Sequence, residues 1–300
     1  MARIELTQGL WLPMVTPMRD EQVDLDGVQR LASHYAAAGV DGLIVLGTTG
    51  EGGLLTEVER TMVAAATLEA VQGALPVMAG VGGVATHTVR EQVCRLDRFA
   101  LAGYLVPPPY YLRVSDEGVA WHMRSIAGQT DKPLMLYNVP KRTGCTISPD
   151  LALRLATHPR IVALKECDAA GMRALAQQNR IAVFCGDDMS MLDHLLRGGQ
   201  GIVPASAHVR PDLFVRLLQY VRTGREEAAR ALFRQLSPLI QLLFDEPNPV
   251  PVKAALALCG LARADVRRPL TPTSKSLMAR LDAALALLPP VQAARTAQAA

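Results

Sequence analysis

The sequence predicts an α/β protein, a (β/α)8 TIM barrel followed by a C-terminal helical extension. Short segments rich in valine, isoleucine and leucine alternate with longer amphipathic ones along the chain. The alternation repeats eight times, the number that closes a barrel of parallel strands. No glycine fingerprint follows the first apolar segment, as it would in an open, doubly wound sheet. Half of the 300 residues are hydrophobic, so the chain can bury a large core.

The candidate strands are short apolar runs that end in turn-forming or polar residues. They comprise residues 10–15, 42–46, 77–81, 103–106, 134–137, 161–165, 181–185 and 201–203. Helical patterns lie between them. Residues 26–38 follow Asp24, and residues 57–71 follow Thr56. Aspartate and threonine both cap helix N-termini, so we expect helices to begin at these points.

After about residue 210 the strand pattern stops and the chain becomes helical. The helices expected there are residues 211–223, 225–244, 252–261 and 274–287. We expect the first of them to complete the barrel, residues 1–224, and the others to form the extension, residues 225–300. The prolines within residues 248–251 should end the helical run before Val252, because proline cannot continue a helix interior. The tail after residue 290 should be frayed.

Composition excludes several classes of function. The net charge is only +3 and like charges form no block, so neither nucleic acid nor a membrane is expected as a partner. The five cysteines form no Cys-x-x-Cys pair and the six histidines do not cluster with them, which argues against disulfides and metal sites. The first 12 residues do not resemble a signal peptide, and no apolar run reaches ~18 residues. We therefore expect a cytoplasmic protein.

Lys165 is the most informative single residue. Only five of the 31 basic residues are lysines, and this one ends an apolar strand. Alternation along a strand places it on the same face as Ile161 and Ala163. If that face lines the barrel, desolvation favours the neutral amine that attacks a carbonyl. The alternative is an ion pair with Glu166 or Asp187 at the strand ends.

Other polar residues also follow the candidate strands, at the end where barrel enzymes carry their active sites. Tyr137 ends the strand before Lys165, and its phenol could move protons with Thr48 and Thr49 as a relay. Alternatively, Tyr137 is a core aromatic and the threonines are turn residues. The loop of residues 47–53 lacks the Gly-Lys-Ser/Thr ending of a phosphate-binding loop, so phosphate is not expected.

These residues belong to an ordered set of motifs. The set is Thr16-Pro17, Gly47-Thr48-Thr49-Gly50-Glu51, Pro109-Tyr110-Tyr111, Tyr137-Asn138-Val139-Pro140, Arg142-Thr143-Gly144, Lys165-Glu166, Gly186-Asp187-Asp188 and Asn248-Pro249-Val250-Pro251-Val252-Lys253. The chain thereby resembles the dihydrodipicolinate synthase family. The resemblance implies a (β/α)8 barrel, a homotetramer built as a dimer of dimers, and the condensation of pyruvate with L-aspartate-4-semialdehyde in lysine and diaminopimelate biosynthesis.

The resemblance also implies roles for individual residues. Lys165 would form an imine with pyruvate, so that no cofactor is needed. Tyr137 would relay protons through Thr49 to Tyr111, which would reach in from a neighbouring subunit. The remaining assignments concern substrate binding. Thr48 and Thr49 would hold the pyruvate carboxylate, Arg142 the carboxylate of the aldehyde, and the backbones of Gly186 and Val203 would line the site.

Two alternatives to this reading remain. N-acetylneuraminate lyase and 2-keto-3-deoxy sugar acid aldolases share the barrel, the lysine and the tyrosine, but generally lack an arginine matching Arg142. A non-catalytic barrel that senses a 2-oxo acid would be expected to have lost Lys165 or Tyr137. The chain departs from the family pattern at Pro108, Leu112 and His208, which puts fine substrate preference in doubt.

The family resemblance further leads us to expect insensitivity to lysine. Members that respond to lysine bind it near the double tyrosine, and typically have asparagine where this chain has Val84 and glutamate where it has Thr88. Gly52, Glu57 and Tyr110 also match that region. A bound lysine molecule needs partners for its ammonium and carboxylate groups. Burying these charges unpaired costs on the order of several kcal/mol.

Overall fold

The predicted barrel is present and closed. We describe residues 8–176 and 178–290 of a computed structural model, in which eight parallel strands form one ring. In ring order they are β1 (Gly9–Leu12), β10 (Gly201–Ile202), β9 (Ala182–Cys185), β8 (Ile161–Glu166), β7 (Leu134–Asn138), β6 (Gly103–Val106), β5 (Val77–Gly80) and β4 (Gly42–Val45). Each predicted strand is confirmed. A small hairpin, β2 (Met18–Arg19) with β3 (Gln22–Val23), was not predicted.

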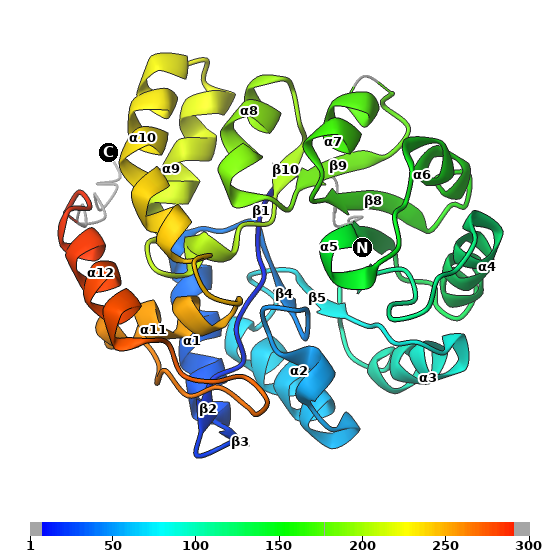
Figure 1. Cartoon of the computed structure of the whole chain (residues 1–300). Coiled ribbons are helices and arrows are strands. Elements are labelled where there is room, and N and C mark those ends of the chain that lie inside the picture. Colours follow the sequence, from blue (N-terminus) through cyan, green and yellow to red (C-terminus); the bar gives the residue numbers. More distant parts are fainter. Residues whose placement is uncertain (1–7, 177, 291–300) are drawn as a thin grey trace, which may run out of the picture.

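Helices surround the strands, as Figure 1 shows along the barrel axis. They are α1 (Leu25–Ala38), α2 (Glu57–Val71), α3 (Thr86–Leu96), α4 (Asp116–Ala127), α5 (Pro140–Thr143), α6 (Pro149–Leu155), α7 (Ala169–Leu175), α8 (Met191–Leu196) and α9 (Pro211–Arg222). Short 3-10 turns are η1 (Gly52–Leu54), η2 (Asp188–Ser190) and η3 (Ala205–His208). Asp24 and Thr56 cap α1 and α2 as predicted.

The core has two parts, and the inner one positions the site. A large cluster packs the strands against the helices, whereas a smaller cluster fills the barrel lumen. Tyr137, Ala163 and Phe184 belong to the lumen cluster, while Leu164 belongs to the outer one. Because side chains alternate along a strand, Lys165 follows Ala163 on the inward face of β8.

The extension packs beside α1 and α9 as α10 (Glu226–Leu242), α11 (Val250–Leu258) and α12 (Lys275–Ala286) (Figure 1). One detail of the prediction is wrong, because α11 begins at Val250 rather than after Pro251. Proline is tolerated in the first turn of a helix, where its missing N–H has no intrahelical partner. The division of the chain at residue 224 stays a prediction, and the tail expected to fray lies outside the described residues. Among residues 8–176 and 178–290, no helix is long and apolar enough to cross a bilayer.

A buried ion pair ties the extension to the loop that follows β4. Lys253 of α11 pairs with Glu51, and both side chains are at most 1% exposed. The Lys253 ammonium also donates to the Asp265 carbonyl at 2.9 Å, and Glu51 accepts from the backbone N–H of Arg267 at 2.9 Å. Burial lowers the pKa of Lys253, and Glu51 opposes that shift. The loop therefore depends on the extension for its position.

We predict that Lys253→Ala destabilises the protein by about 3–5 kcal/mol, because it leaves the Glu51 carboxylate buried without a counter-charge. The measurement is equilibrium unfolding in denaturant. The matched control is the double variant Glu51→Gln with Lys253→Met, which keeps the volume and removes both charges, and it should cost clearly less. A loss below about 1 kcal/mol for Lys253→Ala would contradict the importance given to this pair.

Candidate active site

Tyr137 and Lys165 meet at the carboxyl end of the barrel. They are paired in the register of β7 with β8 and are 7% and 6% exposed. The Lys165 Nζ lies 4.5 Å from the centroid of the Tyr137 ring. The sequence predicted this proximity from strand order and alternation. The structure thus places a buried amine directly beside a phenol.

The alternative reading of Lys165 as a salt-bridge residue is not realised. Within the described part of the chain, Lys165 forms no ion pair with a carboxylate. Glu166 turns away and accepts hydrogen bonds from Asn138 Nδ2 at 2.8 Å and from the backbone N–H groups of Cys167 and Asp168 at 2.8 and 2.9 Å. Its carboxylate thus ties β8 to β7, and Lys165 keeps the tyrosine ring as its neighbour.

Gly186, at the end of β9, leaves room for the lysine. A Cβ atom at this position would lie 2.7 Å from Lys165 Cε and 2.6 Å from Cys167 Sγ. Any side chain at position 186 would therefore displace Lys165. Val203 follows β10, is 1% exposed and packs in the lumen cluster with Tyr137. That the backbones of these two residues contact substrate stays a prediction.

The two threonines after β4 have different surroundings. Thr48 lies near the Tyr137 hydroxyl; burial raises the pKa of Tyr137, and the Lys165 ammonium and Thr48 oppose the rise. Thr49 instead accepts a hydrogen bond from Asn248 Nδ2 at 2.9 Å. That Thr49 relays protons between Tyr137 and Tyr111 stays a prediction. Both threonines lie in a tight turn, which the Glu51 N–H closes by donating to the Thr48 carbonyl at 3.1 Å.

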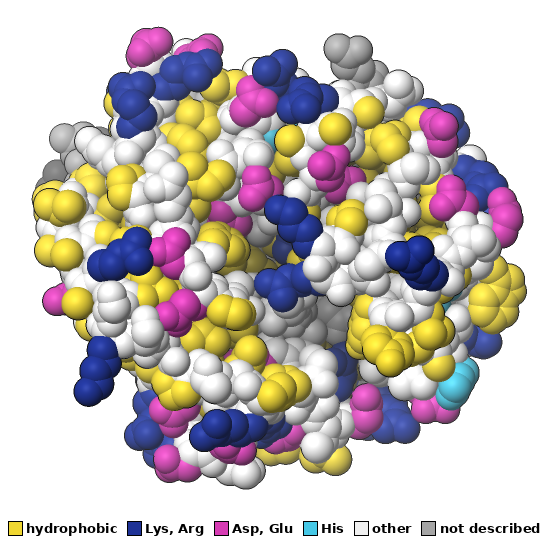
Figure 2. Space-filling view, viewed as in Figure 1, with side chains coloured by type: hydrophobic (Ala, Val, Ile, Leu, Met, Phe, Trp, Pro, Cys, Tyr) yellow, Lys and Arg dark blue, Asp and Glu magenta, His cyan; other side chains and the backbone are white. Residues whose placement is uncertain are grey.

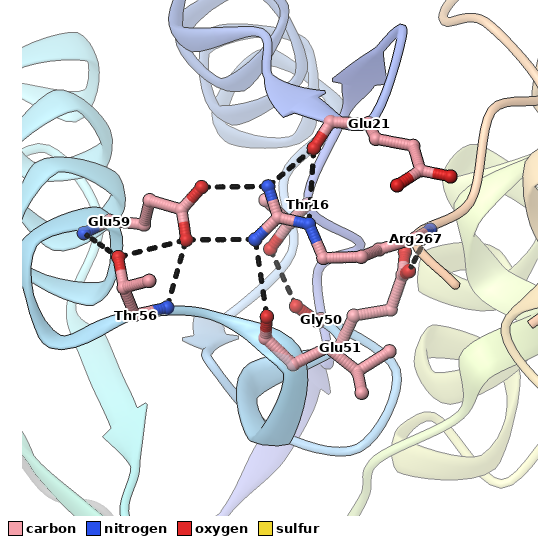
Figure 3. A network of polar contacts seen from close by, with 8 residues as sticks. Thr16, Glu21, Gly50, Glu51, Thr56, Glu59 and Arg267 are labelled. Carbon is pink, nitrogen blue, oxygen red and sulfur yellow. Dashed lines mark hydrogen bonds and ion pairs between the residues drawn. The ribbon is translucent and has the colours of Figure 1, made fainter. Parts of the chain in front are cut away.

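Contacts from two distant segments, one near Thr16 and one near Arg267, fix this turn, as Figure 3 shows. The Thr16 hydroxyl donates to the Gly50 carbonyl at 2.6 Å. From the extension, the Arg267 guanidinium donates to the Leu54 carbonyl at 3.1 Å and to both carboxylate oxygens of Glu59 at 2.7 and 2.8 Å. These hydrogen bonds from Arg267 lower the pKa of Glu59 to about 2. The threonine hydroxyls are therefore held by a rigid loop.

A cavity of about 640 Å³ opens above these residues. Thr48, Tyr137, Arg142 and Asn248 line it, and the Nζ of Lys165 lies 4.5 Å from the ring of Tyr137. Figure 2 shows a hollow near the centre of this face with basic side chains at its rim. Arg142 is exposed, on the short helix α5. A planar guanidinium at the mouth of a cavity that leads to an amine suits a substrate that carries a carboxylate.

Tyr111 does not line the cavity of its own chain. Its side chain is 90% exposed, and its backbone has a φ of 74°, which is rare for a non-glycine residue. The neighbouring Tyr110 does line the cavity. That Tyr111 enters the site of a neighbouring subunit stays a prediction.

Two groups near the site were missed in the sequence. Asp188 is 3% exposed and accepts from the Ser206 backbone N–H at 2.7 Å and from its hydroxyl at 2.6 Å. Burial raises its pKa to about 6, while Ser206 and the Lys165 ammonium oppose the rise. Asn248 is the second group that was missed in the sequence. Both lie in motifs noted in the sequence, but nothing in the motifs shows what the side chains contact.

No cluster of histidine, cysteine or carboxylate residues among the described ones could hold a metal ion.

Comparison with known proteins agrees with this geometry. Residues 6–287 match the model of the Dihydrodipicolinate synthetase family. The chain belongs to this family. It is 36% identical to the 4-hydroxy-tetrahydrodipicolinate synthase of Thermotoga sp. (strain RQ2), over 89% of this chain and 94% of that protein.

Solved structures of the family are similar throughout. The dihydrodipicolinate synthase of Thermotoga maritima has a TM-score of 0.91 at 34% identity, covering 95% of this chain and 100% of that one. A structure described as the first monomeric dihydrodipicolinate synthase variant has a TM-score of 0.92 at 33% identity, covering 95% and 97%. The fold is thus that of this family.

The region matched to lysine binding forms one side of the same cavity. Gly52, Glu57, Thr88 and Tyr110 line it, together with Arg60. The Arg60 side chain is buried and donates to the carbonyls of Gly52 and Gly80, each at 2.8 Å. A fixed guanidinium there repels the ammonium groups of lysine, and Thr88 supplies no compensating charge.

We predict that L-lysine does not inhibit this enzyme. Initial rates measured against added lysine should stay constant at both saturating and limiting pyruvate, and calorimetry should detect no binding. As a matched variant, Val84→Asn with Thr88→Glu supplies an acceptor and a charge, and should gain some response. Clear inhibition of the wild type at sub-millimolar lysine would show that this reading of Val84, Thr88 and Arg60 is wrong.

Proposed function

We propose that the chain catalyses the condensation of pyruvate with L-aspartate-4-semialdehyde, through an imine on Lys165, to give 4-hydroxy-tetrahydrodipicolinate. One observation carries the proposal. Lys165 is buried, has no carboxylate partner among the described residues, and lies 4.5 Å from the ring of Tyr137, which lines a cavity together with Arg142. Membership in the dihydrodipicolinate synthetase family supports the same reaction.

The chemistry follows from the amine. Lys165 Nζ attacks C2 of pyruvate, and loss of water gives an iminium. The iminium accepts the electron pair left when the methyl group of pyruvate loses a proton, and the resulting enamine forms a carbon–carbon bond with the aldehyde. The amino group of the second substrate then attacks C2 and displaces Lys165, which closes the ring. The imine itself is the electron sink, so the reaction needs no cofactor.

The neighbouring hydroxyl groups transfer protons and bind the carboxylate of pyruvate. Tyr137, which lines the cavity together with Thr48, donates and removes protons at the carbinolamine oxygen. Thr49 binds the carboxylate of pyruvate, and the backbones of Gly186 and Val203 line the site. Tyr111 of a neighbouring subunit completes the relay, in a homotetramer built as a dimer of dimers. The exposure of Tyr111 and of the adjacent Leu112, at 90% and 48%, supports such an interface.

Arg142 binds the carboxylate of aspartate semialdehyde, and its position on the cavity wall favours this substrate over sugar acids. We also propose a cytoplasmic location. All five cysteines are unpaired, which is usual in a reducing compartment.

A coupled assay tests this function directly. Purified protein is given pyruvate and aspartate semialdehyde, and in parallel N-acetylneuraminate or a 2-keto-3-deoxy sugar acid. We expect turnover with the first pair and none above background with the sugar acids. Efficient cleavage of a sugar acid, without condensation of the first pair, would replace the proposed function by the alternative.

The same assay defines the role of Arg142. Arg142→Ala should lower kcat/KM for aspartate semialdehyde by about 100-fold, the order expected when a charge-assisted pair is lost, with little change in the KM for pyruvate. Lys141→Ala, one residue earlier on α5, is the control and should behave as the wild type. If Arg142→Ala used both substrates normally, Arg142 would not be the carboxylate clamp.

A further inference from the structure

Asn248 of the extension contacts a residue of the proposed site directly. Its Nδ2 donates to Thr49 Oγ1 at 2.9 Å, across 199 residues of sequence. Asn248 and Pro249 also line the cavity that Tyr137 and Arg142 line. The contact therefore lies at the wall of the substrate cavity.

The position of Asn248 is set by its surroundings. It lies in the turn before α11, where the Val250 N–H donates to the Pro247 carbonyl at 2.9 Å. The first turn of α11 is buried, and Lys253 anchors it through Glu51. Glu51 is two residues from Thr49, so the two ends of the contact are held by the same ion pair.

The direction of the hydrogen bond decides what Thr49 can do. An amide NH2 group only donates, so the contact uses a lone pair of the Thr49 oxygen and leaves the hydroxyl hydrogen for another acceptor. No acceptor for that hydrogen lies within hydrogen-bonding distance among the described residues. Thr49 is only 4% exposed, and Asn248 Oδ1 is also buried without a partner. Buried polar groups are rarely left unpaired without a functional reason.

We infer that Asn248 is a positioning residue that directs the Thr49 hydroxyl toward the carboxylate of pyruvate. The inference rests on the proposed function, because it takes pyruvate as the ligand. Thr49 is buried beside Thr48 and Asn248, which line the cavity, and a carboxylate bound there is an acceptor that suits a lone hydroxyl donor. Thr49 then serves the substrate. The extension thereby helps to bind the first substrate.

Three variants test this assignment in the coupled assay. Asn248→Ala removes the donor and should raise the KM for pyruvate about threefold to tenfold, with kcat within about twofold. Asn248→Asp offers only acceptors, so it should capture the Thr49 hydrogen and raise this KM by about tenfold or more. In a Thr49→Val background, Asn248→Ala should cause no further change, because the residue acts through the Thr49 hydroxyl. The KM for aspartate semialdehyde should stay constant throughout.

Leu281→Ala is the control for general loosening of the extension. It removes a fully buried side chain of α12 and leaves the side chains of Asn248, Thr49 and Lys253 unaltered, so it should lower Tm without changing the KM for pyruvate. Melting curves verify that each variant is folded, and Asn248→Ser replaces any variant that is not.

The outcomes separate the inference from the proposed function. Wild-type protein that does not condense pyruvate overturns the proposed function. Wild-type turnover with an unchanged pyruvate KM in Asn248→Ala and Asn248→Asp overturns only the role of Asn248. Two further results also overturn it. One is that Asn248→Ala raises the KM for pyruvate as much in the Thr49→Val background as in the wild type, which indicates a merely structural contact. The other is normal behaviour of Asn248→Asp, which indicates the opposite direction of the hydrogen bond.

Discussion

Closure of the strand ring is the constraint on which the rest of the molecule depends. The ring closes at β1, and few residues hold it there. β1 pairs with β10 through two residues and with β4 through two more. A buried histidine reinforces it. His208 Nε2 accepts the Val15 N–H at 3.0 Å, and Nδ1 lies 2.7 Å from the Ala205 carbonyl, which requires the proton on Nδ1. Burial lowers the pKa of His208 to about 4, so the ring stays neutral and keeps both contacts.

A closed ring brings the ends of distant strands to one rim. β7 and β8 are neighbours there, so their terminal side chains, Tyr137 and Lys165, face the same lumen. The Lys165 side chain is only 6% exposed, and no carboxylate pairs with it among the described residues. The carboxylates that could have done so, Glu166 and Asp188, are engaged by Asn138 and Ser206. The fold thus keeps the amine available for reaction with a carbonyl.

Local patterns in the sequence were enough to predict much of this arrangement. The eight strands, the caps at Asp24 and Thr56, and the inward direction of Lys165 all follow from periodicities that span only a few residues. Contacts between distant segments could not be predicted in this way. The pairing of Glu51 with Lys253 and the hydrogen bond of Thr49 with Asn248 depend on how the extension and one tight turn are placed. The start of α11 was missed because a proline in a first turn and a proline that ends a helix look alike in sequence.

The central claim is that Lys165 is the nucleophile that binds pyruvate covalently. Incubation of the folded protein with pyruvate and borohydride, followed by mass spectrometry of its peptides, tests it most directly. The account predicts one pyruvate-derived adduct per chain, located on the peptide that contains Lys165 and absent from Lys165→Ala. An adduct on Lys132 or Lys141 instead, or no adduct in a folded sample, would contradict it.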